Sequence, residues 1–146
     1  MTESTFEPER LVAALNTAGV AYVIVGGIAA TAHGVVRATR DVDLVPEPGA
    51  ENLGLLARTL AALGAEHPTG DVSTTFGTRY GDVHVLNRMP AVSSYERLRE
   101  NAILIELAPD VRAAVCSLAD LRSMKLASGR PRDLVDVAEL DELNDH

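Results

Sequence analysis

Residues 22–45 read YVIVGGIAATAHGVVRATRDVDLV, and this stretch decides the fold. Its β-branched start, residues 22–25, predicts a buried strand that ends at the turn Gly26-Gly27, where the backbone comes close to another group. A second strand carries Asp41 and Asp43. Because residues i and i+2 of a strand share a face, their carboxylates project side by side, with Cα atoms roughly 6–7 Å apart. Paired carboxylates bind hard divalent cations, and a glycine turn offers amide groups to phosphates, so the stretch predicts metal-assisted phosphoryl chemistry.

The overall composition fits one globular domain. The chain has 146 residues, of which 47% are hydrophobic and 23% charged, enough for a single buried core. Aromatic residues make up 3%, so we expect a core of Val, Leu, Ile and Ala. The formal net charge of −8 argues against sequence-independent nucleic-acid binding through a broad basic surface, and any contact with RNA should therefore be local.

Cysteine content and the N-terminal residues predict a cytoplasmic protein. Cys116 is the single cysteine, which excludes an internal disulfide, and its apolar neighbours predict a small buried strand residue. The first seven residues lack the basic and apolar regions of a secretion signal. No apolar run approaches the length of a membrane span, so we expect no membrane partner.

Local patterns predict a mixed β-sheet with helices packed over it, an α/β (α+β) arrangement. The expected elements are a helix over 6–18 capped by Ser4 or Thr5, strands over 21–25 and 41–45, a short helix after Gly27, a helix over 51–63, an antiparallel hairpin over 72–78 and 82–86, a helix from Ser93 or Ser94 to about Asn101, strands over 103–107 and 111–116, a helix from Ser117 to Gly129, and a last helix from Pro131. The expected buried stripes are Leu53, Leu56, Leu60 and Leu63 in the helix over 51–63 and Leu134, Val137, Leu140 and Leu143 in the last helix.

Several of these residues together resemble a known superfamily. Val25-Gly26-Gly27, Gly34 and the run Arg37-x-Thr39-x-Asp41-x-Asp43 resemble the nucleotidyltransferases that include DNA polymerase β. With the tail over 124–136, the likeness covers nearly the whole chain and is closest to the short AbiEii-type toxins of type IV toxin-antitoxin systems. The resemblance implies a nucleotidyltransferase fold that occupies residues 1–146 as a single domain.

The resemblance also implies a reaction and roles for named residues. A nucleoside monophosphate would pass from a nucleoside triphosphate to an acceptor hydroxyl with the help of two metal ions, Mg²⁺ or Mn²⁺. Asp41 and Asp43 would be the catalytic, metal-binding pair. The implied nucleotide-binding residues are Gly26, Gly27, Arg37, Thr39 and Lys125.

The chain departs from the superfamily pattern at two places. The third carboxylate, expected on a neighbouring strand, falls on His84, which suits Mg²⁺ poorly as a ligand but is chemically able to act as a base. Asp82 shares a strand face with His84, so a small change of register would let it serve as the catalytic third ligand. Gly27 stands where many relatives carry serine, and backbone amides would then contact phosphate alone.

Alternatives remain open for the basic residues and for the helix that ends the chain. Lys125 falls on an inward stripe, where it would reach the triphosphate or else extend to the surface. Arg37 and Arg40 would meet phosphate or RNA, or would only balance the carboxylates that they flank. Asp133 and Asp136 would interact favourably with the helix dipole.

The motifs do not identify the acceptor. The toxin resemblance suggests tRNA, with a cognate antitoxin or a second copy of the chain as partner. Aminoglycoside- and lincosamide-modifying enzymes share the signature, which makes a small-molecule hydroxyl the alternative. Because of His84, a nucleotide-binding or partner-binding module without turnover is the competing hypothesis from another class.

Overall fold

A six-stranded mixed sheet forms the centre of the chain in a computed structural model, which describes residues 5–66, 74–87 and 94–144. The strand order is β3-β4-β2-β1-β6-β5. The two strands of the deciding stretch are therefore central neighbours. The strands are β1 (Tyr22–Val25), β2 (Asp41–Pro46), β3 (Thr74–Thr78), β4 (Gly81–Val85), β5 (Ile103–Ala108) and β6 (Val111–Val115).

The register of the central strands positions the polar residues. β1 runs antiparallel to β2, so that Val25, the last residue before the glycine turn, lies opposite Asp43. β4 runs parallel to β2 and places Asp82 beside Asp41 and His84 beside Asp43. The four polar side chains therefore come from paired positions on two adjacent strands.

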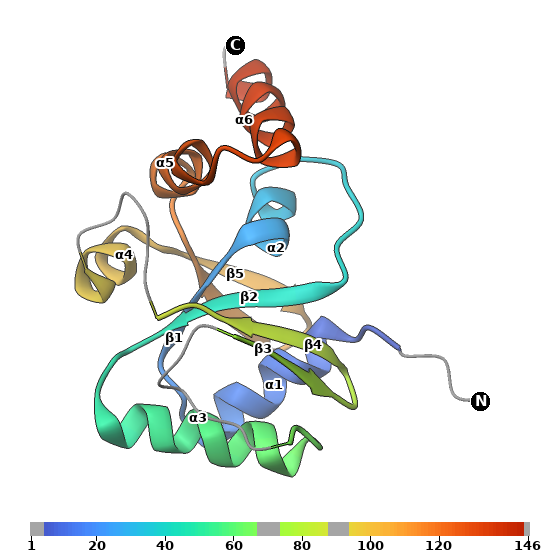
Figure 1. Ribbon diagram of the computed structural model, residues 1–146, viewed down its shortest axis with the longest axis vertical. Helices are drawn as coiled ribbons and strands as arrows, with labels where there is room; N and C mark the ends of the chain where they lie inside the picture. Colours follow the sequence, from blue (N-terminus) through green and yellow to red (C-terminus); the bar gives the residue numbers. More distant parts are fainter. Residues whose placement is uncertain (1–4, 67–73, 88–93, 145–146) are drawn as a thin grey trace.

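Helices cover both faces of the sheet. Figure 1 shows α1 and α3 on one face and α2, α5 and α6 on the other. α5 and α6 pack closely against each other, and α5 also contacts α2. The helices are α1 (Pro8–Ala18), α2 (Gly26–Ala32), α3 (Ala50–Ala62), α4 (Tyr95–Asn101), α5 (Leu118–Ser128) and α6 (Pro131–Asn144).

The core is aliphatic, as the composition predicts. Leu11 and Leu15 from α1 and Leu56 and Leu60 from α3 are fully buried, as is Ile24 at the centre of β1. Each such side chain contributes roughly 1.5–3 kcal/mol through removal of its apolar surface from water. In the part of the chain that the structure describes, no helix is long and apolar enough to span a membrane.

Two capping predictions are confirmed and one is wrong. Ser94 and Ser117 accept hydrogen bonds from the backbone amides three residues further on, at 3.2 and 3.1 Å, and so cap α4 and α5. Thr5 does not cap α1, because the helix begins later: Glu7 is its N-cap residue, without a side-chain cap bond, and Pro8 opens it. Ser4, Ser93 and the start of the expected strand at 72 lie outside the described residues.

Polar residues are buried at two places where the sequence predicts leucine. Asn52, rather than Leu53, is buried in α3, where it accepts a hydrogen bond from the Ala21 amide at 2.7 Å and donates to the Ala21 carbonyl at 2.8 Å. In α6, Leu134 and Leu143 are 46% and 47% exposed, so the predicted stripe is wrong at both ends. The buried positions there are Asp133, Asp136, Val137 and Leu140.

Candidate active site

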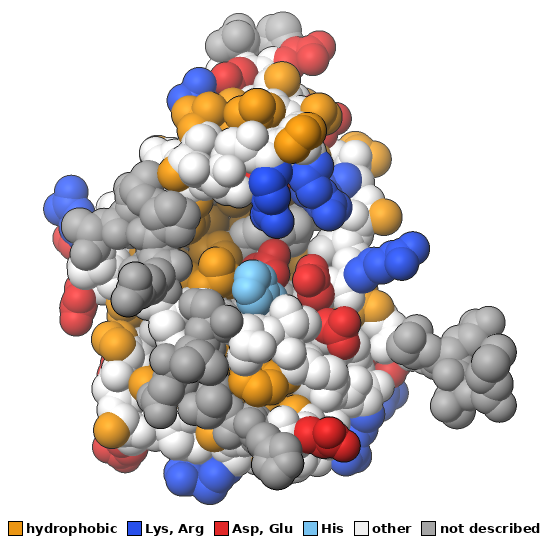
Figure 2. Space-filling model, in the orientation of Figure 1, with side chains coloured by type: hydrophobic (Ala, Val, Ile, Leu, Met, Phe, Trp, Pro, Cys, Tyr) orange, Lys and Arg blue, Asp and Glu red, His pale blue; other side chains and the backbone are white. Residues whose placement is uncertain are grey.

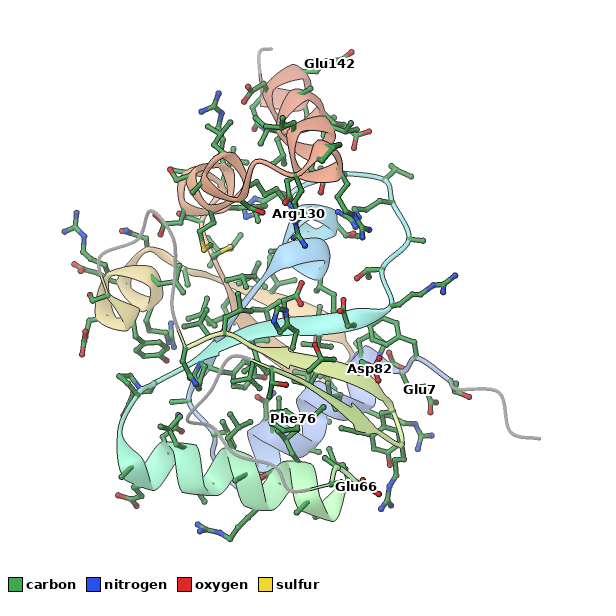
Figure 3. The ribbon with its side chains drawn as sticks, viewed as in Figure 1. Glu7, Glu66, Phe76, Asp82, Arg130 and Glu142 are labelled. Carbon is green, nitrogen blue, oxygen red and sulfur yellow. The ribbon has the colours of Figure 1, made fainter. Side chains whose placement is uncertain are left out.

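A cleft of about 640 Å³ lies between the sheet and the two C-terminal helices. Figure 2 shows acidic and histidine side chains on one side of the hollow and lysine and arginine side chains on the other. In Figure 3, Asp82 lies on β4 and Arg130 lies where α5 joins α6. The cleft is thus bounded by walls of opposite charge. All the predicted site residues of the deciding stretch line it, namely Gly26, Gly27, Arg37, Thr39, Asp41 and Asp43, whereas Gly34 of the motif does not.

The glycine turn is shaped by its contact with Asp43. Gly26 has a φ of +70°, and a Cβ at this position would lie 1.9 Å from Asp43 Oδ2, so only glycine fits. The Gly27 amide donates a hydrogen bond to the Asp43 carboxylate. The turn therefore holds one of the two predicted metal ligands directly.

Electrostatics make the carboxylate pair suitable for a cation. Burial raises the pKa of Asp43, the charge of Asp41 raises it further, and His84 and the Gly27 amide oppose the rise only partly. His84 Nδ1 lies 3.3 Å from Asp43 Oδ1. A hard divalent cation would relieve the repulsion of the pair, and carboxylate oxygens are the ligands such a cation prefers, so Asp41 and Asp43 fit it.

In the described part of the chain, no third carboxylate joins Asp41 and Asp43 in a group that could hold a metal ion. Asp82 neighbours Asp41 in the register, but its side chain is exposed and does not line the cleft. His84 lines the cleft instead and contacts Asp43. Among the described residues, no group of three or more His, Cys, Asp or Glu side chains is arranged to hold a metal ion. A metal-binding or catalytic role for Asp82 remains a prediction.

The opposite wall rests on two buried aspartates. Lys125 Nζ donates to Asp136 Oδ2 at 2.8 Å and lies 3.4 Å from Asp133 Oδ1. Arg37 Nη1 donates to the same Asp136 oxygen. Since the Lys125 side chain is 6% exposed, it neither extends to the surface nor stands alone: it is one member of a buried ion-pair cluster.

Asp133 anchors the turn between α5 and α6 in the same way. Its Oδ2 accepts hydrogen bonds from Ser128 Oγ at 2.7 Å and from Arg130 Nε at 2.8 Å. The hydrogen bond and charge of Asp133 raise the pKa of Arg130, to which Asp43 adds a smaller effect from across the cleft. Asp133 and Asp136 therefore pair with named cations, which is a stronger role than the predicted dipole interaction.

Two further arginines stand at the cleft without an ion-pair partner among the described residues. Arg40 directly precedes Asp41, and Arg132 lies in the first turn of α6. Both are exposed. Neither Arg132 of α6 nor Arg130 of the preceding turn was a predicted site residue. The one available signal was the density of basic residues between Lys125 and Arg132 in an acidic chain.

One part of the cleft is apolar. Its lining includes four apolar side chains, those of Val25, Leu86, Leu121 and Met124. Such a surface suits the flat, largely apolar face of a nucleobase or of another ring. The cleft therefore combines a carboxylate pair, a cationic wall and an apolar area.

Comparisons with known proteins identify the fold. No protein-family model matches the chain, and no curated protein matches its sequence. The solution structure of the antibiotic-resistance factor ANT(2'')-Ia superposes with a TM-score of 0.64 at 15% identity, covering 93% of this chain and 81% of that one. The crystal structure of ANT(2'')-Ia with adenylyl-2''-tobramycin gives a TM-score of 0.60 at 14% identity, covering 93% and 86%.

The match to a third solved structure extends over almost the full length of both chains. TM1012 from Thermotoga maritima, a candidate nucleotidyltransferase, gives a TM-score of 0.60 at 15% identity over 99% of this chain and 98% of its own. The chain thus has the nucleotidyltransferase fold in a single mixed α/β domain, as the sequence predicts. At these identities the likeness shows the fold, and function has to be argued from the site.

Proposed function

We propose that the protein is a metal-dependent nucleotidyltransferase that moves a nucleoside monophosphate from a nucleoside triphosphate to an acceptor hydroxyl, releasing pyrophosphate. The observation that carries the proposal is the pairing of Asp41 and Asp43 on one cleft wall with a cationic wall opposite, in this fold. A triphosphate needs both, because its charge must be balanced on both sides of the reacting phosphorus. Mg²⁺ or Mn²⁺, held by the two aspartates, would supply Lewis-acid stabilisation of the phosphoryl oxygens.

The residues of the chain divide the remaining work. Arg37 and Lys125 would bind phosphate oxygens while Asp136 keeps both side chains in the cleft wall. Gly26 lets the backbone approach Asp43 closely, and Gly27 holds that carboxylate through its amide. His84 contacts Asp43 and orients it, and a base role toward the acceptor hydroxyl is proposed for His84 with Asp82 as the alternative.

An anionic acceptor is favoured by the charge at the cleft. Arg40 and Arg132 have no ion-pair partner in the described part of the chain, and both line the cleft, Arg40 directly before Asp41 and Arg132 in the first turn of α6. Exposed arginines suit a phosphodiester backbone and would repel a polycationic drug. We therefore propose an RNA acceptor, with tRNA the first candidate, as in the AbiEii-type toxins that the sequence resembles.

The proposed toxin function also implies a partner and a cellular location. A cognate antitoxin or a second copy of the chain would complete the acceptor site, because a single small domain offers little surface beyond the cleft. Nucleoside triphosphates and tRNA occur together in the cytoplasm, which is where we propose that the protein acts.

A transfer assay tests the proposal. Wild-type protein is incubated with each of four labelled nucleoside triphosphates, with Mg²⁺ or Mn²⁺, and with total tRNA or tobramycin as acceptor. The controls are Asp41→Asn/Asp43→Asn, which should abolish transfer, and Asp141→Asn, which alters an exposed ion pair with Arg122 and should not. Label on tRNA supports the proposal as stated, whereas label on tobramycin supports the small-molecule alternative, which is the chemistry named for the ANT(2'')-Ia complex.

Binding without transfer to any acceptor would favour the second hypothesis. The observation behind it is that a histidine, not a third carboxylate, lies beside Asp43. A module of that kind would bind a nucleoside triphosphate in the same cleft and form no product. Asp41→Asn/Asp43→Asn would then weaken metal-dependent nucleotide binding alone.

A further inference from the structure

Exposed apolar side chains gather on the two C-terminal helices. Leu126 of α5 is 44% exposed, and Leu134 and Val135 of α6 are 46% and 68% exposed. Figure 2 shows hydrophobic side chains over α5 and α6 at the top of the view, above the lysine and arginine side chains of the cleft. Single exposed apolar residues are common on protein surfaces, but a group of neighbouring ones indicates a contact surface.

The helical repeat places the α6 members of this group on one stripe. Successive residues of a helix are rotated by about 100°, so Leu134, Val135 and Ala138 lie within about 100° of one another around the axis. Ala138 is exposed and falls between the two larger side chains. Its small size would let another helix approach closely, because the distance between packed helices depends on the side chains at the contact.

The stripe continues onto α5. Arg122 Nε of α5 lies 2.8 Å from Asp141 Oδ1 of α6, which brings the exposed sides of the two helices together. Leu126 follows Arg122 by about one helical turn, and Leu134 precedes Asp141 by about two. Leu126 and Leu134 therefore lie on neighbouring helices along the same exposed side. We call the four residues Leu126, Leu134, Val135 and Ala138 the α6 face.

The charges at the two ends of α6 oppose the helix dipole. Arg132 lies in the first turn, where the dipole disfavours a cation, and the last turn contains Glu142 and no basic residue. Both side chains are exposed. A second helix packed antiparallel would bring a charge of the opposite sign to each end. The α6 helix itself has the charges that such a second helix would need.

We propose that a second copy of the chain docks on the α6 face, with the two α6 helices packed antiparallel about a two-fold axis. A two-fold contact uses the same surface on both copies, and the antiparallel arrangement sets Arg132 of each copy near Glu142 of the other. Because each copy has a net charge of −8, association needs an arrangement of this kind that matches opposite charges. The contact borders the cleft, since Arg132 also lines it.

Sedimentation equilibrium of the full chain over a range of concentrations tests the proposal. Val135→Glu puts a charge into the apolar contact and should raise the dimer dissociation constant about thirtyfold or more. Leu134→Glu, on the other side of the stripe, gives an independent measurement. Leu104→Glu is the matched control, because Leu104 is an equally exposed apolar residue, at 63%, on the edge strand β5. It should leave the dissociation constant unchanged.

A charge exchange tests the antiparallel arrangement. Arg132→Glu alone would place two glutamates together at each end of the contact and should weaken the dimer about tenfold. Arg132→Glu/Glu142→Arg restores opposite charges and should bring the dissociation constant back to within about threefold of the wild type. A parallel pair of helices would not respond in this way, because like ends would then lie together.

Each outcome supports or overturns the proposal. A wild-type chain that stays monomeric at every concentration overturns it, as does a dimer that survives both Val135→Glu and Leu134→Glu. A dimer lost in Leu104→Glu would place the contact at the edge of β5 instead. A double variant no tighter than Arg132→Glu overturns the antiparallel arrangement. Because association alone is measured, failure here leaves the proposed transfer reaction standing, and failure of that reaction leaves the dimer standing.

Discussion

Replacement of Asp136 by asparagine should be strongly destabilising. One oxygen of this carboxylate accepts hydrogen bonds from Lys125 Nζ, at 2.8 Å, and from Arg37 Nη1. The Asp136 and Lys125 side chains are 7% and 6% exposed, so water cannot take over from the lost charge. In the variant, Lys125 keeps only the 3.4 Å contact with Asp133, whose other oxygen is already shared by Ser128 and Arg130.

The magnitude follows from the burial of the cluster. Removal of one partner of a buried ion pair costs about 3–5 kcal/mol, because an unbalanced charge stays in a low-dielectric site. The nearby Asp133 places this case at the lower end, so we expect a loss of about 3 kcal/mol in the free energy of unfolding. For a chain of this length that corresponds to a fall of about 10 °C in the unfolding midpoint.

Urea unfolding and thermal unfolding, followed by circular dichroism, measure the effect. Asp141→Asn is the matched control, because it makes the same chemical change at a position further along α6, in an exposed pair with Arg122. It should leave the midpoint nearly unchanged. A loss below about 1 kcal/mol for Asp136→Asn would show that the buried cluster is not balanced by this carboxylate and would refute the reasoning.

Four further results are expected. Burial raises the pKa of the Cys116 thiol to about 12, so a thiol reagent at pH 8 should modify the native protein roughly a hundredfold more slowly than the urea-unfolded protein. Burial alone would raise the pKa of Asp133, but the hydrogen bond from Arg130 and neighbouring groups outweigh it and lower the pKa. The resulting stability is complete above the unfolded-state value and lost as pH falls through the folded-state pKa, and Asp133→Asn should flatten the acid limb of a stability-against-pH curve. His84→Asp should enlarge the Mg²⁺-induced rise in the unfolding midpoint, because it adds a carboxylate beside Asp43. Asp82→Ala should reduce the Mg²⁺-induced rise in the unfolding midpoint less than Asp41→Asn does, because the Asp82 side chain does not line the cleft. An equal reduction in the two variants would establish Asp82 as a metal ligand.

Sequence reasoning succeeded where the determining interactions are local. A strand fixes Asp41 and Asp43 on one face through its two-residue repeat, whatever lies around it. Ser94 and Ser117 cap helices because each side chain reaches an amide three residues away. The apolar run before Gly26 ends at a turn that only glycine permits, since the φ there is positive.

The prediction for α6 failed because its determining contacts are distant in sequence. Helical periodicity alone places Leu134 and Leu143 on the stripe with Leu140, and it cannot show that Asp133 and Asp136 find cations. The cations of Asp136 lie at Lys125 on α5 and at Arg37, 99 residues before it, whereas Asp133 has one local partner, Arg130, besides Lys125. Burial of a carboxylate is unfavourable by itself and becomes acceptable only when partners come from other elements.

From the sequence alone come the aliphatic core and the paired aspartates, because composition and the two-residue repeat of a strand act without distant contacts. The nucleotidyltransferase fold is what the resemblance of its motifs implies. It took the tertiary structure to show that His84 lies beside Asp43, that Asp82 does not line the cleft, and that the Asp136 carboxylate binds both Lys125 of α5 and Arg37 of the loop before β2. These depend on strand register and on the packing of α5 and α6 over the sheet. Both are set by the whole core rather than by any single stretch of the chain.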